Sequence, residues 1–497
     1  MIWTPRRALI ALIVISAGLR LVWAAVLEPG NDEAYHHLYT LHPALSYFDH
    51  PPMMMWVESA GLWLAGTVTT FTIRLGFILM FAGTTWAMYR WTAHWYGEWP
   101  GFYAAFALNI TGYFTAAAGV FVLPDGPLLF FSVLTMWALS EALVARPGRV
   151  LPWVGVGLAW GGALLSKYHA VFLPVSAVLY VVATPAARRV LRTPGPYLAV
   201  LLGCLVFSPV IVWNATHDWA SFAFQGDRAV GMRFRPEGPL IVLGGQLGYL
   251  LPWIWVDMIL VLLACWRIGR RSAGIGRLAV FLAMVPLVFF TVVSCFRETF
   301  PHWSLIGFVP LYPALGDKWW KKLVAGSRWM PRRLVIGVVV PVSIAIFWAA
   351  QAEYGFIRLK KEPTMEMSGW PSLAKELENR GILNEPNTFL FTTYWFTSGQ
   401  LAYATDGRVP VLCYNPAAPH SFAYWSTPEQ WVGQNGILVS LDDRHDESEG
   451  YAEYFRRIEL IGAFPMTRHG SPFRTVRLYR CVDQLKPFPY RIERRAP

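Results

Sequence analysis

The chain has 497 residues, of which 55% are hydrophobic and only 15% carry a charge. Soluble globular proteins carry about 25% charged residues, so this deficit excludes an ordinary soluble protein and favours a membrane protein. The net charge of +11 does not indicate a nucleic-acid partner. Lys and Arg cluster in short segments between apolar stretches, as they do in the cytoplasmic loops of membrane proteins.

Apolar runs long enough to cross a bilayer recur over the first 353 residues. They lie at about 8–27, 71–91, 99–119, 124–144, 150–166, 168–184, 197–213, 239–264, 278–295, 303–317 and 334–353. The first run lacks a clear small-residue cleavage site, so it is interpreted as an uncleaved span and not as a signal peptide. Residues 1–353 are therefore predicted to form a polytopic α-helical membrane domain of about 11 to 13 spans.

Basic residues concentrate on one side of these predicted spans. If the N-terminus is cytoplasmic, the loops on the outer side carry few cations between the spans, namely Lys167, Arg228, Arg233, Arg235 and Arg297. The cytoplasmic segments hold Arg6, Arg7, Arg146, Arg149, Arg188, Arg189, Arg192, Arg267, Arg270, Arg271, Arg277, Lys318, Lys321, Lys322, Arg328, Arg332 and Arg333. The positive-inside rule then places three parts outside: the loop 28–70, the loop 214–238, and the chain after about 354. Within the first loop, 52–65 is predicted to be an amphipathic helix in the interface.

Residues 354–497 are more polar and are predicted to form a soluble α/β domain outside the cytoplasm. Strands are expected at 388–394, 409–414 and 437–441, with helices at 371–379, 398–404 and 428–432. This alternation favours a largely parallel sheet, with 473–481 as a final strand at an edge. Cys413 and Cys481 lack the CxxC spacing of a zinc site but are candidates for one disulfide.

The first outer loop carries the densest cluster of chemically capable side chains. Asp32 and Glu33 lie in Asn31–His37, and Asp49 and His50 lie in the segment Tyr-Phe-Asp-His-Pro-Pro. Carboxylates and imidazoles are the groups that a general base or a metal site needs. The alternative is an ordinary solvated loop.

Two further candidates stand at the ends of predicted spans. Asp125 lies in Leu-Pro-Asp-Gly-Pro, where it can serve simply as a helix N-cap. Lys167 separates two contiguous apolar runs, and a cation there is costly unless it faces a polar cavity or a partner.

The second outer loop contains His217 and Arg228, which suit an anionic ligand such as a lipid phosphate. Ordinary loop charges would look the same. The chain contains no Walker A loop, dinucleotide fingerprint, GxSxG or HExxH motif. No nucleotide cofactor is therefore expected, and an ATP-driven pump is disfavoured.

Taken in order, these segments resemble the family 39-like glycosyltransferases of the GT-C superfamily. The resemblance rests on the Asp-Glu pair, Tyr-Phe-Asp-His-Pro-Pro, Pro-Asp-Gly-Pro, Ser-Lys-Tyr and the segment 213–222, and it covers about residues 1–320. Protein O-mannosyltransferases and the lipid A aminoarabinose transferase belong to this class. It implies transfer of a sugar from a polyprenyl-phosphate donor to an acceptor at the outer face of the membrane.

The resemblance also implies roles for individual residues. Asp32, with Glu33 beside it, matches the catalytic base, and Asp49 matches an acidic position that binds a metal or orients substrate. His50 stands where a relative has a Lys near the donor phosphate, while Lys167 and Arg228 match cations that hold this phosphate. Tyr168 and His217 lie within the matching segments. The His that helps bind zinc in the aminoarabinose transferase is missing before Arg228, so a divalent metal at Asp49 is left open.

The leading interpretation is therefore a polyprenyl-phosphate-sugar-dependent glycosyltransferase of the bacterial inner membrane. Its expected acceptor is lipid A, lipopolysaccharide core or another envelope glycan, with a protein acceptor second. A transporter or lipid flippase is the main alternative, but it predicts related halves, and no internal repeat is seen. A sensor with an outer domain leaves the Asp-Glu and Phe-Asp-His segments unexplained.

Overall fold

A computed structural model describes residues 3–227, 233–270, 273–357, 362–441 and 446–490. Contacts divide the chain into two compact units. Unit 1 comprises Met1–Ala24 and Ala44–Ser343, and unit 2 comprises Ala25–Pro43 and Ile344–Pro497. Residues 28–43 of the predicted first outer loop thus pack with the C-terminal part of the chain.

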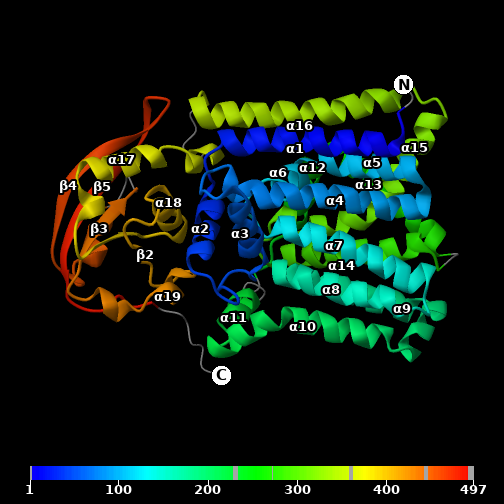
Figure 1. Ribbon diagram of the computed structural model, residues 1–497, viewed down its shortest axis with the longest axis horizontal. Helices are drawn as coiled ribbons and strands as arrows, with labels where there is room; N and C mark the ends of the chain where they lie inside the picture. The colour runs from blue at the N-terminus through cyan, green and yellow to red at the C-terminus, as the bar shows by residue number, and fades with distance from the viewer. Residues whose placement is uncertain (1–2, 228–232, 271–272, 358–361, 442–445, 491–497) are drawn as a thin grey trace. The chain divides into compact units, whose positions relative to one another are not determined.

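Unit 1 is built from helices, several of which run side by side in Figure 1. Its α-helices are α1 (Pro5–Val26), α3 (Met53–Ala65), α4 (Thr72–Tyr96), α5 (Glu98–Ile110), α6 (Gly112–Ala116), α7 (Asp125–Ser140), α8 (Leu151–Ser166), α9 (Phe172–Ala183), α10 (Gly195–Thr216), α11 (Ala220–Asp227), α12 (Gly238–Leu250), α13 (Pro252–Gly269), α14 (Ile275–Ser294), α15 (Tyr312–Val324) and α16 (Trp329–Tyr354), whose last residues belong to unit 2, as do those of α1. Shorter helical segments join them: η1 (Glu141–Ala145), η2 (Tyr168–Val171), η3 (Pro185–Arg192) and η4 (Pro301–Leu311).

Within the described residues, six helices are long and apolar enough to cross a membrane, or seven if one bent pair counts as a span. The chain is therefore a multi-pass membrane protein, as predicted, while the number of spans stays a prediction. The predicted span 239–264 is broken into α12 and α13 at Leu251, which has a φ of 70°. The following proline disfavours the α conformation at Leu251 and donates no N–H, so the helix stops there.

The predicted helix at 52–65 is confirmed as α3, which packs closely against α4. A Cβ on Gly61 would lie 2.7 Å from the backbone nitrogen of Gly76, so only glycine permits this approach. The helix consequently has a buried side that includes Met54 and Met55, and it is fixed to the bundle.

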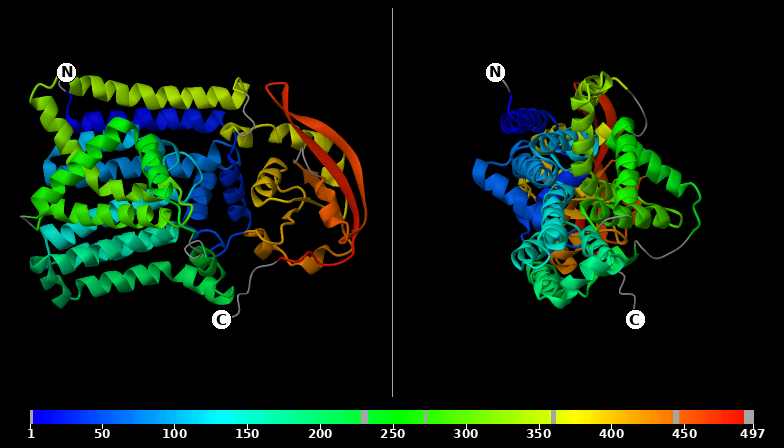
Figure 2. Two further views of the ribbon diagram at one scale, coloured as in Figure 1. Left: turned by 180° about the vertical axis from the view of Figure 1, so that it is seen from behind. Right: turned by 90° about the vertical axis from the view of Figure 1, so that its right-hand side faces the viewer.

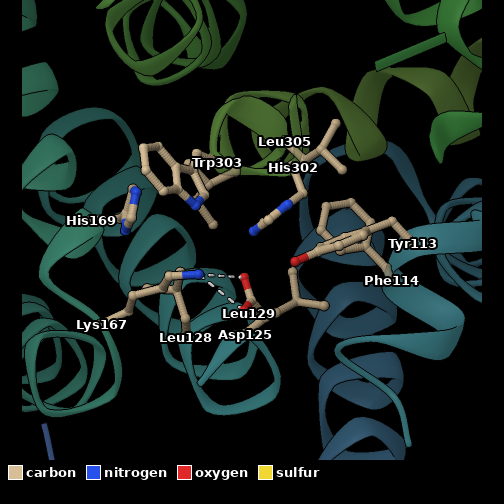
Figure 3. Close-up of a pocket in the computed structure, with 11 residues that line it drawn as sticks. Tyr113, Phe114, Asp125, Leu128, Leu129, Lys167, His169, His302, Trp303 and Leu305 are labelled. Carbon is tan, nitrogen blue, oxygen red and sulfur yellow. Dashed lines mark hydrogen bonds and ion pairs between the residues drawn. The ribbon is translucent and has the colours of Figure 1, made fainter. Parts of the chain in front are cut away.

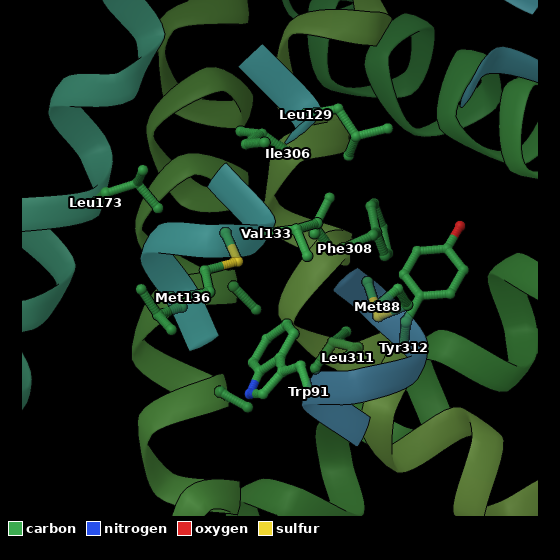
Figure 4. Packing of buried hydrophobic residues seen from close by; sticks show 14 of the residues in the cluster. Met88, Trp91, Leu129, Val133, Met136, Leu173, Ile306, Phe308, Leu311 and Tyr312 are labelled. Atoms are coloured by element: carbon green, nitrogen blue, oxygen red, sulfur yellow. The ribbon is translucent and has the colours of Figure 1, made fainter. Parts of the chain in front are cut away.

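The core of unit 1 brings together side chains from α4, α7, α9, η4 and α15 (Figure 4). Met88 and Trp91 of α4 meet Val133 and Met136 of α7 there. Trp91 is 1% exposed, and its indole nitrogen donates a hydrogen bond to the Ser140 hydroxyl at 3.1 Å. Burying the indole without leaving its N–H unpaired avoids a cost of about 1–3 kcal/mol.

Unit 2 combines helices with a five-stranded sheet. Its helices are α2 (Asn31–Leu41), α17 (Trp370–Asn379), α18 (Trp395–Ala404), α19 (Phe422–Trp425), η5 (Pro363–Met367), η6 (Ile382–Asn384), η7 (Pro428–Trp431) and η8 (Glu447–Tyr451). Its strands are β1 (Thr388–Thr392), β2 (Val411–Cys413), β3 (Asn435–Ser440), β4 (Phe455–Arg468) and β5 (Ser471–Gln484), in the order β2-β1-β3-β5-β4. The predicted α/β class is confirmed.

The sheet corrects two expectations. It is parallel only between β1 and its neighbours β2 and β3, whereas β3–β5 and β5–β4 are antiparallel. The final strand does not lie at an edge, because the unpredicted strand β4 pairs outside it in the long hairpin visible in Figure 2. The sequence concealed β4 because it is half exposed, rich in charge and interrupted by Gly462 and Pro465, which an edge strand tolerates.

The disulfide expected as a candidate between Cys413 and Cys481 is wrong. Both thiols are free and buried. Cys413 lies on β2 and Cys481 on β5, with β1 and β3 between them in the sheet. Neighbouring strands are about 4.8 Å apart, so three strand spacings far exceed the reach of a disulfide.

Candidate functional site

Asp32 and Glu33 occupy the first turn of α2, not an irregular loop as the sequence suggested. Glu33 is 3% exposed, and its Oε2 accepts a hydrogen bond from the Gly30 backbone at 3.1 Å. Glu33 therefore closes the N-terminus of the helix in the manner of a capping box. Asp32 is exposed on the same turn, so it is the carboxylate of the pair that can meet a substrate.

Helix α2 is held firmly within unit 2. A Cβ on Gly399 of α18 would lie 2.8 Å from the Cα of Tyr35, so the two helices touch through the glycine. The Tyr35 hydroxyl accepts a hydrogen bond from the Ser421 backbone at 2.9 Å. The buried amide of Gln400 donates to the Pro29 carbonyl at 2.9 Å, just before the helix begins. These contacts fix the turn that carries Asp32.

In unit 1 the structure pairs Asp125 with Lys167, two candidates chosen separately from the sequence (Figure 3). The Lys167 Nζ donates to both carboxylate oxygens at 3.0 Å. Asp125 is the first residue of α7 and makes no side-chain cap, so the simple N-cap interpretation is wrong. Lys167 follows the last residue of α8 and is 6% exposed, which confirms that this costly cation has a partner.

The pair lines a small cavity of about 20 Å³, room for roughly one water molecule. Tyr113 of α6, His169 of η2 and His302 of η4 also line it, and Figure 3 shows the His302 ring directed toward Asp125. The Tyr113 and His302 rings stack at 5.4 Å. One ammonium group, two imidazoles and a phenol hydroxyl thus converge, which is a donor set suited to an anion.

Sequence reasoning missed most of this cavity. His169 lies two positions after Lys167 and His302 lies just before a predicted span, and neither belongs to a motif that singles it out. Tyr113 gave no signal at all, because a tyrosine among apolar residues is usual in a membrane helix. Tyr113, His169 and His302 come from three separate elements, α6, η2 and η4, so only the tertiary structure brings them to Asp125 and Lys167.

The segment 213–222 has a structural explanation. The Asn214 side chain accepts hydrogen bonds from the Ser221 and Phe222 backbones at 3.2 and 3.3 Å, which closes the turn between α10 and α11. The Tyr168 hydroxyl lies 2.6 Å from the Ser221 hydroxyl, tying η2 to this turn. His217 stacks on Trp213 at 4.1 Å, and its Nδ1 lies 2.7 Å from the Trp213 carbonyl.

Asp49 and His50 lie before α3. Asp49 is 6% exposed, and its carbonyl accepts a hydrogen bond from the Gln225 amide at 2.9 Å, which joins this segment to α11. Arg228 falls outside the described residues. Within the described part of the chain, no group of three or more His, Cys, Asp or Glu side chains is placed to hold a metal ion, so Asp49 does not belong to such a group.

Three comparisons relate the chain to known proteins. A family model described as dolichyl-phosphate-mannose-protein mannosyltransferase matches residues 49–213, a range that contains Asp49, Asp125 and Lys167. The lipid A galacturonosyltransferase RgtD of Rhizobium johnstonii is 28% identical over 284 residues, 56% of this chain and 58% of that protein. The match therefore spans less than two thirds of that relative.

A second relative is the undecaprenyl phosphate-α-4-amino-4-deoxy-L-arabinose arabinosyl transferase 2 of Proteus mirabilis. It is 22% identical over 414 residues, covering 79% of this chain and 70% of that protein. The crystal structures of ArnT from Cupriavidus metallidurans, in the apo state and bound to undecaprenyl phosphate, share the fold. Each has a TM-score of 0.63 and 15% identity over 95% of this chain and 97% of ArnT.

The family-model match lies over the helices that hold the Asp125–Lys167 pair, and the ArnT fold extends over nearly the whole chain, sheet domain included. These findings agree with the resemblance carried by the Asp-Glu, Phe-Asp-His-Pro-Pro and Ser-Lys-Tyr segments. The chain is therefore similar in sequence to membrane glycosyltransferases, and it shares the fold of ArnT.

Proposed function

We propose that this protein transfers a sugar from a polyprenyl-phosphate-linked donor to a lipid A-type glycolipid or another envelope glycan. The observation that carries the proposal is the buried Lys167 ammonium group on a cavity that His169 and His302 also line. Fixed cationic and N–H donors stabilise the negative charge that develops on a departing phosphate. The undecaprenyl phosphate bound to ArnT and the lipid A named for RgtD support this choice of donor and acceptor.

Asp32 acts as the general base in this proposal. It takes the proton from the acceptor hydroxyl while the acceptor oxygen bonds to the anomeric carbon, and the bond from that carbon to the phosphate oxygen breaks. Polyprenyl phosphate leaves with the electron pair. Direct displacement inverts the anomeric configuration, so retention of configuration in the product would refute it.

Lys167 binds the donor phosphate in the same proposal, and Asp125 keeps the ammonium group in place until the donor arrives. The cavity is too small for a phosphate as it stands, so the phosphate competes with the Asp125 carboxylate for Lys167. Tyr168, His50, Asp49, His217 and Arg228 are proposed to contact the donor or the acceptor. Glu33 shapes the turn that presents Asp32.

The reaction is placed at the outer face of the bacterial inner membrane, with a cytoplasmic N-terminus and the C-terminal domain in the periplasm. The charge asymmetry of the loops supports this orientation. A polyprenyl-linked donor suits that location, because it reaches the outer face without a nucleotide sugar.

Asp32→Asn tests the proposal, with Asp406→Asn as the matched control on an exposed turn of unit 2. Transfer from a labelled polyprenyl-phosphate sugar should fall about 10²- to 10⁴-fold in the first variant only, because a positioned base contributes that much. Mass spectrometry of envelope lipids from cells with and without the protein identifies the sugar and its bearer. Unchanged transfer by a folded Asp32→Asn variant would sink the role of Asp32.

A further inference from the structure

Glu366, a residue without any sequence signal, lies at the N-terminus of α2 beside the Asp-Glu pair. It belongs to η5, and the Asn31 backbone N–H, in the first residue of α2, donates a hydrogen bond to it. A Cβ on Gly30 would lie 3.2 Å from the Glu366 Oε1 and 3.9 Å from the Glu33 Oε2. The two carboxylates therefore meet over Gly30, whose missing side chain leaves them room.

The backbone of Glu366 is held from two helices. The Gln400 amide of α18, 1% exposed, donates to the Glu366 carbonyl at 3.0 Å and also bonds Pro29. The indole nitrogen of Trp370, in α17, donates to the same carbonyl at 2.8 Å. Glu366 and the start of α2 share Gln400 as a common donor, so the carboxylate is kept at the helix terminus.

The ionisable groups that act on Glu366 are carboxylates. Asp32 and Glu33 face it from α2, whereas α17 and α18 contribute the neutral Trp370 and Gln400. The buried Arg468 pairs instead with Glu362, at the start of η5, at 2.9 Å. Burial first, and then the negative charges of Asp32 and Glu33, raise the pKa of Glu366 to about 7.

We propose that Glu366 is a positioning residue for Asp32: it holds the first turn of α2 and, when ionised, strengthens Asp32 as the base. The inference rests on the proposed function, in which Asp32 accepts the proton of the acceptor hydroxyl. A second negative charge close to a carboxylate favours proton uptake by that carboxylate. Ionised Glu366 and Asp32 repel each other, and this repulsion is relieved as Asp32 takes the proton of the acceptor hydroxyl.

The pH dependence of transfer separates this role from a purely structural one. In the wild type, kcat should rise as the pH increases through about 7, where Glu366 ionises. Glu366→Gln can still accept the hydrogen bond from Asn31 but cannot ionise. At low pH the kcat of Glu366→Gln should equal that of the wild type. At pH 8, where the wild-type kcat has risen, the kcat of the variant should be about 10-fold lower, while its KM for the donor is unchanged.

Glu366→Asp keeps an ionisable group and should restore the rise in kcat. Glu378→Gln is the matched control, because Glu378 lies on α17 of the same unit and is ion-paired at the surface with Arg408. Its profile should match that of the wild type. A persistent rise near neutral pH in Glu366→Gln would overturn the inference, and so would an equal loss of kcat at every pH.

The outcomes also separate this inference from the proposed function. An active Asp32→Asn variant defeats the proposed function itself, whatever Glu366 does. An inactive Asp32→Asn variant together with a wild-type profile for Glu366→Gln defeats only the role of Glu366.

Discussion

Unit 1 and unit 2 hold their candidate carboxylates in opposite ways. In unit 1, Asp125 is buried against a cation, Lys167, which donates to both of its oxygens. In unit 2, Glu33 and Glu366 are held by backbone N–H groups, and each lies close to another carboxylate. The first arrangement neutralises charge, whereas the second concentrates negative charge around Asp32.

The difference matches the chemistry proposed for each unit. A cation that must capture a phosphate is best kept in place by a carboxylate that the phosphate can displace. A base gains from neighbouring negative charge, which favours proton uptake. The sheet domain of unit 2 therefore has a role in the proposed chemistry, because it holds the helix that carries Asp32.

The largest effect is expected where the charge pair of unit 1 is broken. Lys167→Met leaves the Asp125 carboxylate buried and unpaired, which should destabilise the protein by about 3–5 kcal/mol. The double variant Asp125→Asn with Lys167→Met removes both charges and should recover most of that stability. Thermal unfolding in detergent measures the stability of both variants. Donor binding by the double variant then tests the phosphate role of Lys167. Normal donor affinity in the double variant would contradict the phosphate role of Lys167.

Close helix contacts through glycine give a second comparison between the units. Gly61→Ala in unit 1 and Gly399→Ala in unit 2 each place a Cβ within 3 Å of backbone, so each should cost about 1–3 kcal/mol. Only Gly399→Ala displaces α2, so it should reduce transfer more strongly at equal stability. Gly450→Ala, whose Cβ meets open space, is the control for both. Equal activity in the two variants would argue against α2 as the carrier of the base.

Stability should also depend on pH through unit 2. The pKa of Glu366 in the folded protein, about 7, lies above its ordinary value of 4.5. Below the pKa of the unfolded state, an acid whose pKa is raised by folding contributes its full stabilisation. This contribution is lost as the pH rises through the pKa of the folded state. Unfolding between pH 5 and pH 8 should show a loss on the order of 2 kcal/mol that Glu366→Gln lacks. If the stability of Glu366→Gln fell with pH as steeply as that of the wild type, the loss would belong to other groups.

The smallest effect is expected from reduction. Cys413 and Cys481 are free thiols separated by two strands, so a reductant should leave the unfolding temperature of the protein unchanged. The double variant in which both become Ala should respond to reductant in the same way. A reductant-sensitive unfolding temperature in the wild type alone would show that the two thiols had paired.

The sequence predicted the helical membrane domain and the α/β class well, because both follow from local patterns. Long apolar runs gave α1, α7, α10 and α14, and short buried runs gave β1, β2 and β3. It failed for β4, whose mixed and interrupted pattern carries no clear period, and for the break at Leu251, where Pro252 outweighed the apolar pattern.

For the candidate site, too, local patterns identified single residues but not the contacts between them. The cost of a cation between two apolar runs singled out Lys167, and the cluster of carboxylates and imidazoles in the first outer loop singled out Asp32. Asp125 was predicted to be simply a helix N-cap. Only the tertiary structure paired Asp125 with Lys167 and brought Glu366 to the start of α2, 334 positions after Asp32 in the numbering. Such contacts depend on how distant helices pack, and no local pattern of residues encodes that.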